Sequence, residues 1–143
     1  MDAFDADALI YAAAPEHALG QRVVAFLTQT PVASRQPPAA VGSLLLLPEL
    51  LAEPHREGTD GEVQRLVALL SRIDLRPLDD ATADLAVALG AAYRLRAADS
   101  VHLATAVGAG ADRFVTNNRR DFDQAIDEID VTYLEDLPDL AAS

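Results

Sequence analysis

The segment LRAADSVHLATAVGAGADRFVT, residues 95–116, decides the fold class of this chain. Its first half has helical spacing, with one shared face formed by Asp99, His102, Leu103 and Ala106 between small apolar flanks. We therefore expect a helix over residues 97–107, and a short strand over Arg113–Thr116. A helix followed closely by a strand is typical of α/β proteins.

The same alternation continues on both sides of this segment. Helices are expected over residues 6–14, 18–27, 43–56, 61–71 and 80–93 and from 119 onward. Strands are expected over residues 2–4, 73–78 and 131–134, and an extended connection is expected over residues 31–38. Pro48 predicts a kink in the 43–56 helix or a start near that position. Short strands alternating with helices predict a mostly parallel sheet with helices on both faces. The functional crevice of such a sheet lies at the carboxyl ends of its strands.

Length and composition indicate one domain spanning residues 1–143. The chain is 50% hydrophobic, which is too apolar for a disordered protein, and it has no apolar run of about 20 residues that would cross a bilayer. The first residues, MDAFDAD, are acidic where a secretory signal would be basic. The absence of cysteine excludes disulfides, thiolate zinc sites and cysteine nucleophiles. We expect a cytoplasmic protein without a membrane segment.

The charge of the chain is unevenly distributed. A net charge of −12 argues against a nucleic-acid binder, because a uniformly negative surface repels phosphates. All 11 basic residues are arginines, however, and five of them lie within 27 residues that contain only two acids: Arg94, Arg96, Arg113, Arg119 and Arg120. The last 23 residues contain eight acids and no base. The arginines therefore have two interpretations, as phosphate contacts or as ion-pair partners of the acidic tail or of another protein.

Three acids in the first half of the chain are candidates for a site. Asp5 follows the first strand, and Asp7 opens the next helix; both also suit a helix N-terminus, as a cap and a dipole partner. Glu49 lies in SLLLLPELLAE, among nearly all apolar neighbours. A carboxylate buried there costs several kcal/mol unless a cation or several donors meet it, and the alternative is that it reaches the surface.

Two further acids lie in the second half. Asp99 is a candidate ligand, although its place in the first helical turn also suits the dipole, and His102 is expected to support the site or the core. Asp121 and Asn118 have the spacing of a capping box, which does not exclude a catalytic role for Asp121. Asp5, Asp99 and Asp121 can gather at one strand edge. Converging carboxylates repel one another unless a hard cation such as Mg²⁺ or Mn²⁺ joins them.

Five segments, in order, resemble the PIN-domain family, specifically its VapC-like ribonuclease toxins. DADALIYA (5–12) resembles D-T-N-x-L-I-Y-A, SLLLLPELL (43–51) the segment with the family's glutamate, and residues 95–116 the motif L-R-A-x-D-A-x-H-L-A-x-A with G-A-D-x-F-V-T. TNNRRDF (116–122) resembles T-x-N-x-x-D-F, and VTYLEDLPDL (131–140) the terminal strand and tail. There are two departures. Asp7 replaces the usual Asn, and PPAAV (37–41) is expected to interrupt a strand found in relatives.

The resemblance implies a three-layer α/β/α PIN-like sandwich and a metal-dependent endoribonuclease that leaves 5′-phosphate and 3′-hydroxyl ends. Asp5 and Asp99 would hold Mg²⁺ or Mn²⁺, with Glu49 and Asp121 completing the catalytic cluster. The implied supporting or substrate-contacting residues are Asp7, His102, Thr116, Asn117, Asn118, Arg94, Arg96, Arg119 and Arg120. The implied partners are RNA, a small antitoxin protein and a second copy of the chain in a homodimer.

Two other interpretations remain open. The first is a catalytically silent PIN-fold binding module that acts through protein partners, which the net charge favours. The second is an acid phosphatase or a structure-specific DNA nuclease, because a fold does not by itself set the substrate.

Overall fold

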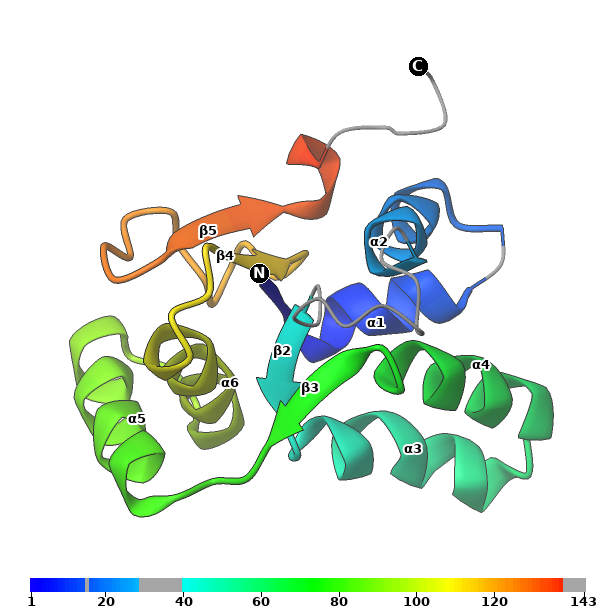
Figure 1. Cartoon of the computed structure of the whole chain (residues 1–143), viewed down its shortest axis with the longest axis horizontal. Helices are drawn as coiled ribbons and strands as arrows, with labels where there is room; N and C mark the ends of the chain where they lie inside the picture. The colour runs from blue at the N-terminus through cyan, green and yellow to red at the C-terminus, as the bar shows by residue number, and fades with distance from the viewer. Residues whose placement is uncertain (15, 29–39, 138–143) are drawn as a thin grey trace.

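The computed structural model describes residues 1–14, 16–28 and 40–137 (Figure 1). Within these residues five strands form one sheet in the order β3-β2-β1-β4-β5, and every neighbouring pair runs parallel. The strands are β1 (Asp2–Phe4), β2 (Ala40–Ser43), β3 (Ile73–Arg76), β4 (Arg113–Thr116) and β5 (Asp130–Tyr133). The predicted parallel sheet is therefore confirmed.

Helices cover both faces of this sheet. They are α1 (Ala6–Ala13), α2 (Ala18–Thr28), α3 (Leu46–Glu57), α4 (Asp60–Leu70), α5 (Asp80–Tyr93) and α6 (Ala97–Gly108), and a short 3₁₀ turn, η1 (Leu134–Asp136), follows β5. Figure 1 shows α5 and α6 on the left of the sheet and α1 to α4 on the right. The three-layer α/β/α architecture agrees with the prediction.

Alternating side chains of the strands build two separate cores. Phe4 and Val115 pack with α1 to α4, whereas Ala3 and Phe114 point the other way and pack with α5 and α6. This alternation follows from the two-residue period of a strand. The three central strands β2, β1 and β4 are thus largely buried on both faces, as is usual in a parallel sheet, whereas the edge strand β3 is only partly buried.

The strand order reverses at β1. The chain runs from β1 to β2 and β3 on one side, then crosses to β4 and β5 on the other. β4 therefore lies beside β1, with Asp2 opposite Arg113, and the amide of Asp5 continues the ladder to the Val115 carbonyl at 2.9 Å. A reversal of this kind opens a crevice at the carboxyl ends of the two strands. The residues that follow β1 and β4 meet there.

The predicted helix over residues 43–56 is wrong at its start. Ser43 ends strand β2, and α3 begins at Leu46. Pro48 lies in the first turn of α3, where a missing N–H removes no intrahelical bond, so the predicted start near Pro48 is confirmed.

The predicted strand interruption in residues 37–41 is also wrong. Ala40 and Val41 pair with both β1 and β3. Both paired residues carry a backbone N–H, and the two prolines before them lie outside the described residues. The expected extended connection over 31–38 lies outside the described residues.

A helix from Arg119 does not form. Turns replace it, because short polar side chains bond to nearby backbone amides: Asn118 Oδ1 accepts from the Asp121 amide at 3.2 Å, and Asp123 Oδ1 accepts from the Ala125 amide at 2.8 Å. The remaining helices agree with prediction to within one or two residues. None of the helices in the described ranges has both the length and the apolar character needed to cross a membrane.

Candidate active site

Two acids from the β1–α1 junction meet the end of β4. Asp5 caps α1, accepting from the Ala6 amide at 2.8 Å, and its second oxygen accepts from the Thr116 hydroxyl at 3.0 Å. Asp7, in the first turn of α1, accepts from the Asn117 amide at 3.2 Å. The Thr116 side chain, which is fully buried, therefore joins two segments more than 100 residues apart in the sequence.

The carboxyl group of Asp5 is strongly perturbed. Asp5 is only 4% exposed. This burial is the largest cause, and the charge of Asp7 the second, that raises the pKa of Asp5 to about 7. His102 and the hydrogen bonds from Thr116 and Ala6 act in the opposite direction on this pKa. The Asp5 carboxylate thus carries its charge at neutral pH only against an unfavourable environment, which a bound cation would relieve.

Asp121 is fixed beside this pair by Asn118. The side-chain nitrogen Nδ2 of Asn118 donates to Asp121 Oδ2 at 2.9 Å, and the side-chain oxygen Oδ1 of Asn118 accepts from the Asp121 backbone amide. The backbone amide of Asn118 donates to the Thr116 hydroxyl oxygen at 2.9 Å. The capping-box spacing therefore closes a turn at the crevice and leaves the Asp121 carboxylate half-buried and oriented.

Glu49 and His102 form the second half of the site. His102 Nε2 lies 3.0 Å from Glu49 Oε2; the His102 side chain is 2% exposed and that of Glu49 is 30% exposed. Glu49 therefore reaches the surface only in part and also has a hydrogen-bond donor. Each of the two alternatives for this carboxylate, a buried group met by donors and a group that reaches the surface, thus applies in part. His102 lies behind it in the core.

Asp99, at the first turn of α6, connects the two halves electrostatically. Burial first, then the charges of Asp121 and Glu49, raise the pKa of Asp99, while His102 and Arg96 lower it. His102 therefore links the predicted acids, because it interacts electrostatically with Asp5 and Asp99 and lies within hydrogen-bond distance of Glu49. Asp99 interacts electrostatically with Asp121 and Glu49 rather than through hydrogen bonds.

The donor set suits a hard divalent cation. Carboxylate oxygens are ligands that Mg²⁺ and Mn²⁺ prefer, and Mg²⁺ is usually bound by one or two carboxylates, water and substrate oxygens. The raised pKa values of Asp5 and Asp99 show that their negative charges are unfavourable without a neighbouring cation. Across the described residues, no three His, Asp or Glu side chains already stand at metal-binding positions together. A cation held by two of these carboxylates and by water is compatible with both observations.

The arginines of the basic stretch occupy different surroundings. Arg94 and Arg120 are exposed, and Arg96 caps α6 next to Asp99. Arg119 forms an ion pair with Glu135 and lies over the Tyr133 ring, 4.2 Å from its centroid. For Arg119, the interpretation as a partner of the acidic C-terminal segment therefore applies. Arg113 pairs with Asp2 at 2.7 Å, at the amino ends of β4 and β1 and therefore at the opposite end of these strands from the crevice.

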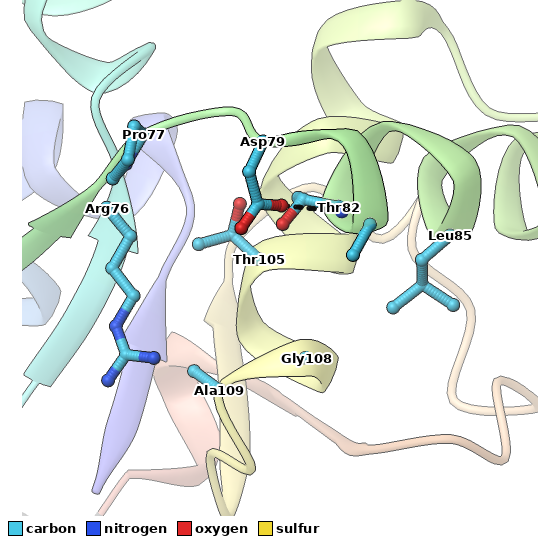
Figure 2. Close-up of a pocket in the computed structure, with 9 residues that line it drawn as sticks. Arg76, Pro77, Asp79, Thr82, Leu85, Thr105, Gly108 and Ala109 are labelled. Carbon is cyan, nitrogen blue, oxygen red and sulfur yellow. Dashed lines mark hydrogen bonds between the residues drawn. The ribbon is translucent and has the colours of Figure 1, made fainter.

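A separate cavity of about 270 Å³ lies between the end of β3, the start of α5 and the end of α6 (Figure 2). Its polar side chains have partners of their own: Asp79 caps α5 through the Thr82 amide at 2.8 Å, and Thr105 donates to the Val101 carbonyl. It contains no residue that the sequence predicted for the site. Figure 2 shows Arg76 and Asp79 facing this cavity from two different elements.

The sequence model of the PIN domain matches residues 4–127. The chain belongs to the PIN-domain family. Solved structures with the same fold include a toxin–antitoxin complex from Klebsiella pneumoniae, with a TM-score of 0.71 and 24% identity over 94% of this chain and 98% of that one. Promoter-bound VapBC2 from Rickettsia felis has a TM-score of 0.69 and 14% identity, covering 92% and 97% of the two chains. DNA-bound VapBC from Salmonella typhimurium has a TM-score of 0.66 and 18% identity, covering 93% and 97%. No curated protein sequence matches the chain.

Three residues that shape this PIN-domain site are not among those predicted from the sequence. Ser43 ends β2 and accepts from the Leu45 amide at 3.1 Å, which turns the chain into the helix that carries Glu49. Tyr133 and Glu135 hold Arg119. A serine before four leucines was a detectable signal for a turn, whereas the Arg119 contacts are long-range and had none.

Proposed function

We propose that this PIN domain is a metal-dependent endoribonuclease and the toxin of a toxin–antitoxin module. The observation that carries the proposal is the crevice beside β1 and β4. There the pKa of buried Asp5 is raised to about 7, and Asp99, Glu49 and Asp121 add further negative charge. Such a cluster is unfavourable on its own and favourable around a divalent cation. The fold shared with known toxin–antitoxin complexes supports the same function.

In this proposal Asp5 and Asp99 hold Mg²⁺ or Mn²⁺, and Glu49 and Asp121 complete the cluster. A cation of this kind withdraws charge from a phosphodiester oxygen and makes water a stronger acid. The residues of the chain position the reactants. Thr116 and Asp7 keep Asp5 and the Asn117 amide in place, and the half-buried Asn117 side chain orients water or a phosphate oxygen. Hydrolysis leaves a 5′-phosphate and a 3′-hydroxyl.

Exposed arginines supply the RNA contacts. Arg94, Arg96 and Arg120 are exposed near the crevice and offer planar donors to phosphate oxygens. Arg119 joins them only when its ion pair with Glu135 opens. The sequence selectivity of cleavage would then depend on the shape of the surface around the crevice and not on these phosphate contacts.

An antitoxin is the proposed protein partner. A groove of about 190 Å³ leads from Glu49 along α1, α3 and α4; its floor includes Leu50, Pro54 and Leu66, and its rim includes Glu53, Glu57 and Glu62. An apolar floor with an acidic rim fits a basic, amphipathic segment. An arginine of that segment would pair with the acids of the site and block it. A homodimer of the toxin is also proposed, to be tested by light scattering.

Thermal unfolding tests the cation site. Wild-type protein in EDTA and then in millimolar Mn²⁺ is expected to gain stability, by about 2.7 kcal/mol when Mn²⁺ is about 100 times its Kd. Asp99→Asn is expected to lose this gain, whereas the matched control Asp84→Asn, an exposed acid on α5, is expected to keep it. RNA, DNA and small phosphate esters are then compared as substrates under the same metal conditions.

A catalytically silent binding module is the second candidate, favoured by the net charge of −12 and by the engagement of Arg119 with Glu135. It predicts no stabilisation of the wild-type protein by millimolar Mn²⁺ and equal inactivity of wild type and Asp99→Asn on every RNA. Either result would move the search to the protein partner.

A further inference from the structure

His102 is buried in a place where an apolar residue would fit more easily. Its neighbours on α6, Leu103, Ala104 and Ala106, are buried core residues. The imidazole makes one hydrogen bond, to Glu49, and among the described residues Nδ1 has no hydrogen-bond partner. A buried polar atom left without a partner destabilises the folded protein. A histidine at this position is therefore less favourable for core packing than an apolar residue.

The hydrogen bond from His102 to Glu49 explains why a histidine occupies this buried position. A carboxylate oxygen only accepts, so Nε2 carries the hydrogen that is donated to Glu49. Glu49 belongs to α3 on one face of the sheet and His102 to α6 on the other. The bond therefore ties the two helix layers together at the crevice. Asp5 and Asp99 both interact electrostatically with His102, so the imidazole lies within the acid cluster.

We propose that His102 is a positioning residue, whose Nε2–H holds the Glu49 carboxylate toward the cation site between Asp5 and Asp99. This assignment rests on the proposed nuclease function. His102 itself contacts neither the cation nor RNA. It limits the rotamers of a glutamate that is 30% exposed and would otherwise be mobile in solvent. Because His102 already restricts the Glu49 side chain, Glu49 loses less conformational entropy when a cation binds.

Two substitutions separate positioning from packing. The amide nitrogen of Gln reaches about as far as Nε2, whereas that of Asn reaches only about as far as Nδ1, so His102→Gln preserves the bond to Glu49 and His102→Asn removes it. Mn²⁺ affinity is measured by electron paramagnetic resonance of the free ion. We expect His102→Gln to stay within about threefold of wild type and His102→Asn to bind about 10- to 100-fold more weakly. The control His55→Asn, an exposed histidine on α3, is expected to have no effect.

A mutant cycle with Glu49 gives the decisive comparison. If His102 acts through Glu49, His102→Asn weakens Mn²⁺ binding no further in a Glu49→Gln background. Additive losses, or equal affinities for the Gln and Asn variants, overturn the proposal. In RNA cleavage the Asn variant is expected to lose kcat with little change in KM, because the arginines that bind RNA are untouched.

Nuclear magnetic resonance of the imidazole nitrogens, recorded in EDTA, tests the pair without metal or activity. The wild-type protein is expected to show the Nε2–H tautomer of His102, with a signal that shifts in Glu49→Gln. This measurement stands even if His102→Asn does not fold. A signal insensitive to Glu49→Gln overturns the positioning role alone. Failure of the wild-type protein to bind Mn²⁺ overturns the proposed function, and with it the cation-binding role of Glu49.

Discussion

At the scale of single residues, Asp5 links the stability of the protein to pH. Its pKa is about 7 in the folded protein and 3.8 in the unfolded chain, so the folded state holds a proton between these values that the unfolded state has released. The stabilisation from this group is complete below 3.8 and is lost as the pH rises through about 7. In EDTA, Asp5→Asn is therefore expected to become more stable than wild type with rising pH, by a few kcal/mol above about pH 7.

Urea unfolding of both proteins from about pH 5 to about pH 8 measures this difference. Asp84→Asn, which removes an exposed charge from α5, serves as the control and is expected to follow the wild-type profile. Wild-type and Asp5→Asn curves that run parallel across the range would contradict the raised pKa.

At the scale of elements, the contact between α1 and α2 depends on Gly20. A Cβ atom there would lie 1.9 Å from the Tyr11 carbonyl oxygen and 2.9 Å from the Ala12 nitrogen, both of them backbone atoms that cannot move aside alone. Gly20→Ala is expected to destabilise the protein by about 3 kcal/mol or more, since the overlap outweighs the better helix propensity of alanine. Gly61→Ala in α4, where only a flexible arginine lies nearby, should change stability by less than about 1 kcal/mol. Chemical denaturation of the two variants makes the comparison, and similar losses would refute the close packing.

At the scale of the whole molecule, the proposed function makes RNA binding depend on the charge distribution. Each phosphate contact contributes about −0.7 to the slope of log affinity against log salt for a single strand. Glu135→Gln releases Arg119 and is expected to raise RNA affinity and to steepen this slope by about one contact. Glu128→Gln removes the same charge from the side chain that Tyr93 binds, without releasing an arginine, and should leave the slope unchanged. Fluorescence anisotropy over a salt series distinguishes the two, and identical slopes would show that only net charge matters.

The errors of prediction have local causes. Helix Asp80–Tyr93 and strand Arg113–Thr116 were predicted with the observed bounds, because strong periodicity or a short apolar run marks them. Ser43 was assigned to a helix because the leucines after it mask the end of a buried strand. The polar run from Asn118 to Asp123 was expected to be helical, yet its side chains bond to nearby amides and form turns.

The sequence by itself determined the α/β class and the PIN family, because these depend on local periodicity and on short motifs whose residues are neighbours along the chain. The same motifs predicted the four acids of the proposed site. Only the tertiary structure decided that β1 lies beside β4 and that Asp5 therefore meets Thr116. It also decided that Glu49 is joined to His102 and that Arg119 is paired with Glu135. Such contacts join segments far apart in the sequence, and their partners follow from the packing of whole layers, for which the periodicity of a single segment contains no information.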